Sequence, residues 1–330
     1  QKVAGSLDLD LITLRLEDIT VENFSSSIYH ADQPLGDSAI IPTYLIAKSI
    51  GQHVKVVLSG EGADELFHGY DHYRYEKYFY QLGKLPFEGA RTLMDLISGM
   101  GIHKFDRIRN KLRSIGSFKN DTGVSRWTSI LSPELSRNYL KTSKQNEGNY
   151  EIQFQNFLQG FGKKSGKLES SLMLDLLTWL PDDLLVKTDR MMMACSVEAR
   201  TPFLDHHLVE EVLRSSSHFN QPLFQSKNYL RQLLKKKLPA SVSELISNRP
   251  KQGFETPKLQ WLSSSLYELS SFLFSEENLK NNPYLNAGMV EALWQDAKKQ
   301  NPGTNNRLVW NIFCFLEWYR QHESKFGFKR

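Results

Sequence analysis

The spacing of hydrophobic residues over the first seventy positions alternates between that of strands and that of helices. Residues 7–16 alternate apolar and polar side chains and then become mostly apolar, which predicts a strand. A helix is expected from residue 38 or 39 to about residue 50, with Pro42 in its first turn, where a missing N–H costs nothing. Val54–Leu58 is short and β-branched, which predicts a buried parallel strand, and a further helix follows at about Asp64. This order predicts an α/β fold with a doubly wound parallel sheet.

From about residue 76 the apolar residues recur at helical spacing and few alternating runs intervene. Amphipathic helices are predicted over five segments: Leu172–Leu180, Leu208–Arg214, Lys227–Leu238, Met289–Lys299 and Leu308–His322. We therefore expect two parts. A partial α/β part covers residues 1–75, and a large, mostly helical part covers residues 76–330.

Composition and charge exclude several classes of protein. The 330 residues carry a net charge of +4, too small to indicate a nucleic-acid or membrane binder. The two cysteines, Cys195 and Cys314, exclude a disulfide-framed secreted scaffold. No apolar run approaches the roughly 20 residues that span a bilayer, and the N-terminus does not resemble a signal peptide. We predict a cytoplasmic protein, and the absence of an initiator Met suggests that the chain begins within a longer one.

A basic stretch over residues 104–119 has two interpretations. Its aromatic residues, Phe105 and Phe118, lie near its ends rather than among the basic residues, where they would stack on bases. We therefore favour a solvated helix face over a nucleic-acid contact.

The strongest chemical signal is Ser59-Gly60-Glu61-Gly62-Ala63-Asp64-Glu65, which follows the predicted Val54–Leu58 strand and opens a helix. Glycines let the backbone turn tightly and approach a ligand closely. A helix N-terminus attracts anions. The three carboxylates either cap the helix or, in the functional interpretation, form a magnesium–polyphosphate site in which Asp64 binds the metal. We favour the functional interpretation, because capping does not require three.

A second motif extends from Asp189 to His206. Its three consecutive methionines are typical of core filling, and Cys195 is interpreted as a small buried residue. Glu198 and Arg200 are too close to face each other on a helix, so each is expected to pair elsewhere. Asp205 precedes a helical segment and is interpreted as its N-cap rather than as a metal ligand.

A third motif, Arg249-Pro250-Lys251-Gln252-Gly253-Phe254, is a basic loop between helices. Alone it is typical of a surface loop. A lysine on such a loop can also reach a polyphosphate as a point charge.

Together these motifs resemble the synthetase domain of the glutamine-dependent asparagine synthetase family, whose relatives include β-lactam and carbapenam synthetases. The resemblance covers nearly the whole chain and four blocks in order: 29–44, Val56–Phe67, Asp189–Asp205 and Lys251–Phe254. It implies a fold of the adenine nucleotide alpha-hydrolase type. It also implies ATP and Mg²⁺ as cofactors, and adenylation of a carboxylate, the aspartate side chain for asparagine synthetase. Ammonia then gives the amide and AMP after pyrophosphate leaves.

The resemblance also assigns roles to individual residues. Ser59, Gly60 and Gly62 would contact ATP, and Asp64 would hold magnesium on the pyrophosphate. Lys251 would stabilise the charge that develops on this leaving group, and Glu61 would help to deprotonate the attacking amine. The lactam-forming relatives carry tyrosine at the place of Glu61, so glutamate favours external ammonia. The substrate-side candidates are Glu198 and Arg200, for which a buried structural ion pair is an equal alternative.

Three departures from the family pattern stand out. The pyrophosphate loop Ser-Gly-Gly-x-Asp-Ser and the N-terminal glutaminase domain are absent from these 330 residues, so we expect very weak adenylation by this segment alone. His68 stands where the family usually has a second glycine before Tyr70. Because the glutaminase domain is absent from these residues, ammonia is expected from a glutaminase domain outside this chain.

Other functions stay open at this stage. The alternatives are an amidotransferase acting on a sugar acid in polysaccharide assembly and a non-catalytic nucleotide-binding relative. A tRNA-modifying enzyme of the same superfamily is disfavoured by the modest charge. The residues alone do not identify the acyl substrate, which is inferred only from the resemblance. They do not determine the oligomeric state either, and a homodimer is one option.

Overall fold

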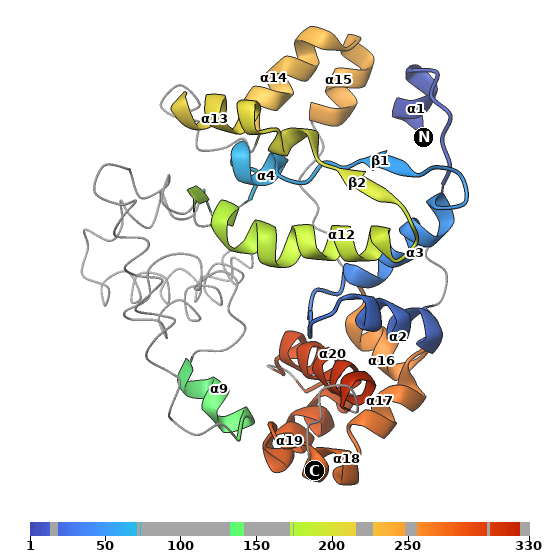
Figure 1. The fold of residues 1–330 in the computed structure, drawn as a ribbon, viewed down its shortest axis with the longest axis vertical. Helices are drawn as coiled ribbons and strands as arrows, with labels where there is room; N and C mark the ends of the chain where they lie inside the picture. Colours follow the sequence, from blue (N-terminus) through green and yellow to red (C-terminus); the bar gives the residue numbers. More distant parts are fainter. Residues whose placement is uncertain are drawn as a thin grey trace, which may run out of the picture.

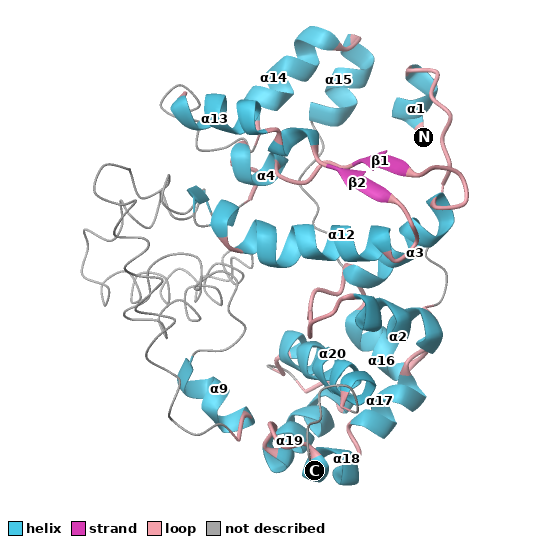
Figure 2. Cartoon of the chain, viewed as in Figure 1, coloured by secondary structure: helices cyan, strands magenta, loops and turns pink. Residues whose placement is uncertain are grey.

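The computed structural model describes residues 1–13, 19–70, 73, 133–141, 172–173, 175–215, 227–247, 256–301 and 304–323. Helices dominate these ranges, and two short strands form one sheet (Figure 1, Figure 2). Two sequence expectations lie outside them: the Lys251 loop and the basic stretch 104–119.

The described elements follow one another in this order: α1 (Lys2–Ser6), α2 (Val21–His30), α3 (Ile40–Ile50), β1 (Val56–Leu58), α4 (Ala63–Leu66), α9 (Pro133–Tyr139), the π-helix η3 (Leu180–Leu185), α12 (Val186–Met193), β2 (Glu198–Arg200), the 3₁₀ helix η4 (Pro202–Leu204), α13 (His206–Arg214), α14 (Asn228–Lys237), α15 (Ala240–Ser247), α16 (Lys258–Ser263), α17 (Tyr267–Leu273), α18 (Glu276–Asn281), α19 (Ala287–Lys298) and α20 (Asn306–His322). The helices predicted near residues 38–50, 227–238, 289–299 and 308–322 are confirmed as α3, α14, α19 and α20.

The sheet joins the two motifs that the sequence singled out. Strand β1 pairs with β2 in parallel, with Val57 opposite Ala199. Val57 packs with Ala47, Met192 and Val197 in a small cluster that involves α3 and α12. The expected parallel strand is therefore confirmed, while the described ranges hold two strands and do not form the full doubly wound sheet.

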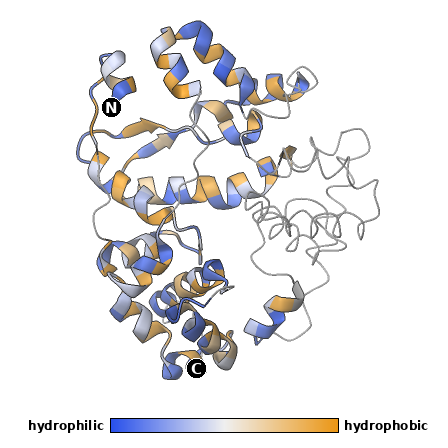
Figure 3. Ribbon diagram, turned by 180° about the vertical axis from the view of Figure 1, so that it is seen from behind, coloured by the Kyte–Doolittle hydropathy of each residue, from blue (hydrophilic) through white to orange (hydrophobic). Residues whose placement is uncertain are grey.

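The expectation that this strand is buried is wrong within the described ranges. Val56 and Leu58 are 47% and 76% exposed, and Figure 3 shows hydrophobic residues along β1. Side chains alternate between the two faces of a strand. Val57 therefore points to the cluster that involves α3 and α12, and the opposite face, with Val56 and Leu58, is exposed.

The strand expected over residues 7–16 is also not found. The described part of this segment, residues 7–13, is irregular and follows the short helix α1. Asp8 has a left-handed backbone with φ of 50°, which turns the chain away from an extended path. Leu9, Leu11 and Ile12 are all more than half exposed. Burial of apolar side chains therefore does not stabilise an extended conformation there.

The largest hydrophobic core lies around α20. Trp310 and Phe313 of this helix are fully buried, and Phe24 of α2 stacks on Phe313 with ring centroids 4.7 Å apart. The same cluster includes residues of α3, α16, α17, α18 and α19. Residues near both ends of the described chain therefore share one core, with α12 and the sheet above it in Figure 1.

Among the helices that the structure describes, none combines the length and the apolar character needed to cross a bilayer.

Candidate functional site

The loop that follows β1 is held by one backbone and one side-chain hydrogen bond. The Ser59 N–H donates to the Arg200 carbonyl at 2.8 Å, which extends the parallel pairing by one bond. The Glu61 N–H donates to Ser59 Oγ at 3.3 Å and tightens the turn. Gly62 then adopts φ of +87° as the N-cap of α4. The helix expected at Asp64 is confirmed, but α4 has only four residues, so its dipole is small.

The glycines of this region differ in whether the local structure requires them. Gly62 has a positive φ, and a Cβ there would lie 2.3 Å from Leu204 Cδ2. A Cβ on Gly69 would lie 1.7 Å from Asp64 Oδ1. Gly60 is different, because a Cβ there would meet no atom within 4 Å and its φ lies outside the left-handed region. Within the described part of the chain, neither steric crowding nor backbone conformation requires glycine at position 60.

His68 shows why this position favours glycine. Its φ is 53°, in the left-handed region, where histidine is tolerated better than β-branched residues. The departure that the sequence indicated therefore falls on a position with special backbone geometry, and the histidine adopts that geometry.

Asp64 lies beside a lysine from a distant part of the chain. Its Oδ1 is 3.1 Å from Lys227 Nζ at the start of α14, and the two side chains are 27% and 29% exposed. Gly69 N–H donates to the Asp64 carbonyl at 2.7 Å, so the chain folds back closely over this carboxylate. Asp64 thus presents a partly exposed carboxylate in a cationic environment.

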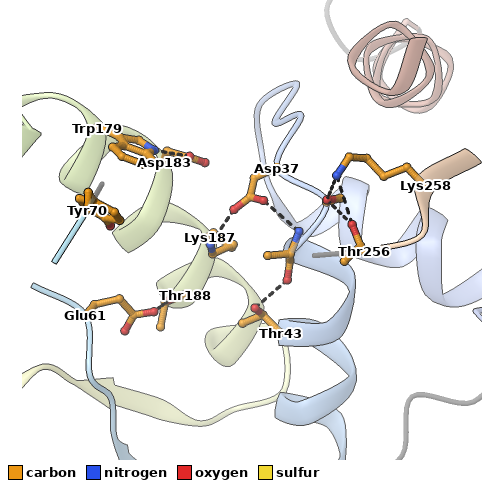
Figure 4. A network of polar contacts seen from close by, with 12 residues as sticks. Asp37, Thr43, Glu61, Tyr70, Trp179, Asp183, Lys187, Thr188, Thr256 and Lys258 are labelled. Carbon is orange, nitrogen blue, oxygen red and sulfur yellow. Dashed lines mark hydrogen bonds and ion pairs between the residues drawn. The ribbon is translucent and has the colours of Figure 1, made fainter. Parts of the chain in front are cut away.

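Glu61 has a different environment from Asp64. Thr188 of α12 donates its hydroxyl to Glu61 Oε1 at 2.5 Å (Figure 4). The other oxygen, Oε2, is buried and has no hydrogen-bond partner among the described residues. The loop and α12, which the sequence separates by more than a hundred residues, therefore meet at this carboxylate.

Glu65 is a third carboxylate with its own role. It is 1% exposed, and Tyr70 Oη donates to its Oε1 at 2.5 Å. Burial raises the pKa of Glu65 above its usual range, and burial together with the charge of Glu65 raises the pKa of Tyr70. Glu65 therefore belongs to the packed interior behind the loop rather than to its open side.

The sequence model of the asparagine synthase family matches residues 1–320. The chain belongs to the asparagine synthase family. Among the relatives that bear an asparagine synthetase name, "Asparagine synthetase [glutamine-hydrolyzing] 1" of Bacillus subtilis is 29% identical over 299 residues, covering 88% of this chain and 44% of that protein. A Mycobacterium bovis protein provisionally given the same function is 28% identical over 313 residues, covering 88% and 43%.

A third relative has a different name. "Amidase chry2" of Gibberella zeae is 22% identical over 353 residues, covering all of this chain and 51% of that protein. The 330-residue chain spans less than half of the length of the two relatives named as synthetases.

Within this family member, Glu198 and Arg200 are not arranged as predicted. They lie on strand β2, where residues two apart share a face. Arg200 Nε donates to Glu198 Oε1 at 2.9 Å, and both side chains are more than half exposed. The expectation that each pairs elsewhere is wrong, because it assumed a helix. The alternative of a buried ion pair is likewise not found.

Other features of the second motif agree with the sequence analysis in part, and Cys195, interpreted there as a buried residue, is only partly buried. Asp205 Oδ1 accepts the N–H groups of His207 and Leu208 at 3.0 and 3.3 Å, which confirms it as the N-cap of α13. Met191 and Met192 are buried as expected of core filling, whereas Met193 is 55% exposed. No cluster of three or more potential metal ligands lies within the described ranges.

The sequence analysis missed several polar residues beside the loop. Lys187 Nζ lies 2.6 Å from Asp37 Oδ2, and Asp37 Oδ1 accepts the Ala39 N–H at 2.9 Å (Figure 4). Asp183 accepts from Trp179 Nε1 at 2.7 Å. Burial raises the pKa of Asp183, and the nearby Asp37 charge raises it further. The available signal was a lysine directly after the apolar run 184–186 and two residues before Asp189.

Proposed function

We propose that this chain is the synthetase part of an ATP-dependent, amide-forming enzyme. It would adenylate the aspartate side-chain carboxylate and transfer ammonia to it, giving asparagine, AMP and pyrophosphate. The observation that carries the proposal is that neither crowding by the described residues nor its backbone conformation requires glycine at position 60. Gly60 lies between β1 and two carboxylates in different environments, Glu61 and Asp64. Close approach of a polyphosphate to the backbone explains a glycine at such a place.

In this proposal the loop residues have different roles. Ser59, Gly60 and Gly62 would contact the nucleotide, and Glu61 would accept the proton of the attacking amine. The substrate-side role of Glu198 and Arg200 and the leaving-group role of Lys251 belong to the same proposal. The ammonia would come from glutamine, as the names of two relatives indicate for those proteins. The division into parts at residue 75 is likewise proposed.

Asp64 is suited to hold magnesium. Mg²⁺ is usually bound by one or two carboxylates together with substrate phosphates rather than by an all-protein cage. A partly exposed carboxylate fits this donor set, and the lysine beside it is compatible with a phosphate-rich site. When bound, the ion would neutralise charge on the pyrophosphate leaving group.

The acyl substrate has a specific alternative. The relatives aligned with most or all of this chain do not all bear an asparagine synthetase name, since the Gibberella zeae protein is named an amidase. A different carboxylate, such as a sugar acid, is therefore included in the test.

The proposal is tested with the full chain as its gene encodes it. Pyrophosphate release from ATP is measured with and without aspartate and ammonia, and then with a panel of other carboxylates. We expect release that depends on aspartate, and a loss of at least tenfold in Asp64→Ala. The control is Asp296→Ala, which removes an exposed carboxylate on α19. Absence of carboxylate-dependent release, or an Asp64→Ala variant equal to the unmodified protein, contradicts the proposal.

A further inference from the structure

We propose that Thr188 is a positioning residue for Glu61: its hydroxyl holds one carboxylate oxygen so that the other is directed at the attacking amine. This inference rests on the proposed function. It adds a residue that lies outside the sequence motifs and on a different element from the loop. The contact that carries it joins α12 to the loop after β1 (Figure 4).

The direction of the hydrogen bond follows from chemistry. An ionised carboxylate can only accept, so the Thr188 hydroxyl must donate to Glu61 Oε1. This bond uses the single proton of the hydroxyl. Thr188 is only 4% exposed, so water does not compete freely for this bond, and the pairing fixes the rotation of the carboxylate group.

The second oxygen is left for chemistry. Glu61 Oε2 is buried, and among the described residues nothing donates a hydrogen bond to it. A buried carboxylate oxygen without a partner is costly in a purely structural role. A general base needs such an oxygen, because it must accept a proton from the reacting group rather than from the protein.

The position of Thr188 is itself fixed by its surroundings. It lies just after the junction of the π-helix η3 with α12, and its neighbour Lys187 is ion-paired to Asp37 at 2.6 Å. π-Helical turns shift the register of the residues that follow, and they occur frequently at functional sites. Lys187 and Thr188 thus extend from one turn of α12 to two different carboxylates.

The step that Thr188 would assist is the aminolysis of the acyl-adenylate. The ammonia lone pair forms the C–N bond at the acyl carbon, and the proton leaves nitrogen for Glu61 Oε2. The bond between the acyl carbon and the phosphate oxygen breaks, and its electron pair leaves with AMP. Glu61 then gives the proton to solvent. Adenylate formation precedes this step and does not use the proton-accepting oxygen.

The test separates the two half-reactions in the full chain. Pyrophosphate released and amide formed are measured together in Thr188→Val, which replaces the hydroxyl by a methyl group of similar size. We expect pyrophosphate release within about twofold of the unmodified protein and amide formation lowered by roughly tenfold to a hundredfold, because a small misplacement of a catalytic group has effects of this size. The ratio of pyrophosphate to amide then rises above one as water captures the adenylate.

Further variants make the result specific. Thr188→Ser keeps the hydroxyl and is expected to restore the ratio. Thr43→Val is the matched control, because Thr43 is a partly buried helical threonine whose hydroxyl donates to the Ala39 carbonyl. In Glu61→Gln, adding Thr188→Val is expected to change the ratio no further, since Thr188 acts through Glu61.

The outcomes distinguish this inference from the proposed function. An equal fall of pyrophosphate and amide in Thr188→Val and Thr188→Ala shows a merely structural role and overturns the inference. An unchanged ratio overturns it as well. If the unmodified chain releases no carboxylate-dependent pyrophosphate, the proposed function fails first. If Glu61→Gln alone leaves the ratio at one, the base assignment fails while adenylation can still stand.

Discussion

At the scale of residues, the three carboxylates of one short loop have three different environments. Asp64 is partly exposed beside a lysine, Glu61 accepts from Thr188 with one oxygen, and Glu65 is buried against a tyrosine. A carboxylate in a charged, open position is suited to cations, whereas a buried one favours its protonated form. Three carboxylates within five positions can therefore have different roles: cation binding, proton transfer and packing in the interior.

The buried Glu65 predicts a pH-dependent stability. Its pKa is raised by burial, so the folded protein binds this proton more tightly than the unfolded chain does. The resulting stabilisation is complete below the unfolded pKa and is lost as the pH rises through the folded pKa. Glu65→Gln cannot ionise, and its side-chain oxygen can still accept from Tyr70. We expect its advantage in urea unfolding over the unmodified protein to grow between pH 4 and pH 8.

The control for this prediction has the opposite sign. The pKa of Glu276 is lowered by its hydrogen bond from Lys280, so its contribution is lost as the pH falls. Glu276→Gln is expected to show a small slope in the other direction. A pH-independent difference between Glu65→Gln and the unmodified protein would contradict the assignment.

At the scale of elements, sequence predicted the regular helices well and the sheet partly. The helices α3, α19 and α20 follow from apolar periodicity, since each buries one face on the core. Helix α14 also forms where it was predicted, although none of its residues is buried. The strand expected over residues 7–16 is not found in its described part, residues 7–13, where the alternating pattern has no neighbouring strand to pair with. Glu198 and Arg200 were misplaced for the same reason: pairing with β1, not local spacing, makes that segment a strand.

The site was predictable only where its residues share a motif. The loop from Ser59 to Asp64 can be recognised from sequence because its glycines and acidic residues lie next to each other. Thr188 and Lys187 do not, because their partners lie 127 and 150 positions away. Their roles depend on how α12 is rotated, and the π-helix before it changes that rotation in a way that periodicity does not reveal.

The N-cap of α13 gives a prediction at this scale. Asp205→Ala removes the oxygen that accepts the first two available N–H groups of the helix. Loss of such a cap costs about 1 kcal/mol, so we expect a lower urea midpoint. Asp205→Asn retains an acceptor oxygen and should recover most of the loss. Equal losses in both variants would show that the charge, rather than the cap, is what matters.

At the scale of the whole molecule, a polar junction connects the sheet region to the helical core. Lys187 of α12 pairs with Asp37. The neighbouring Ser38 Oγ is hydrogen-bonded to Thr256 and lies 3.0 Å from Lys258 Nζ of α16 (Figure 4). Three segments far apart in sequence thus meet at residues 37 and 38.

The Lys187–Asp37 pair therefore predicts a large coupling between two distant segments. Lys187 and Asp37 have 9% and 24% of their side chains exposed. Removing the cation alone leaves Asp37 and the nearby Asp183 without a compensating charge, so Lys187→Met is expected to cost about 3 kcal/mol, near the lower end for breaking a buried pair. Asp37→Asn keeps the oxygen that accepts the Ala39 N–H, and the double variant should therefore be more stable than Lys187→Met alone. Urea unfolding of the four proteins measures this coupling, and strictly additive losses would show that the pair does not hold the two segments together.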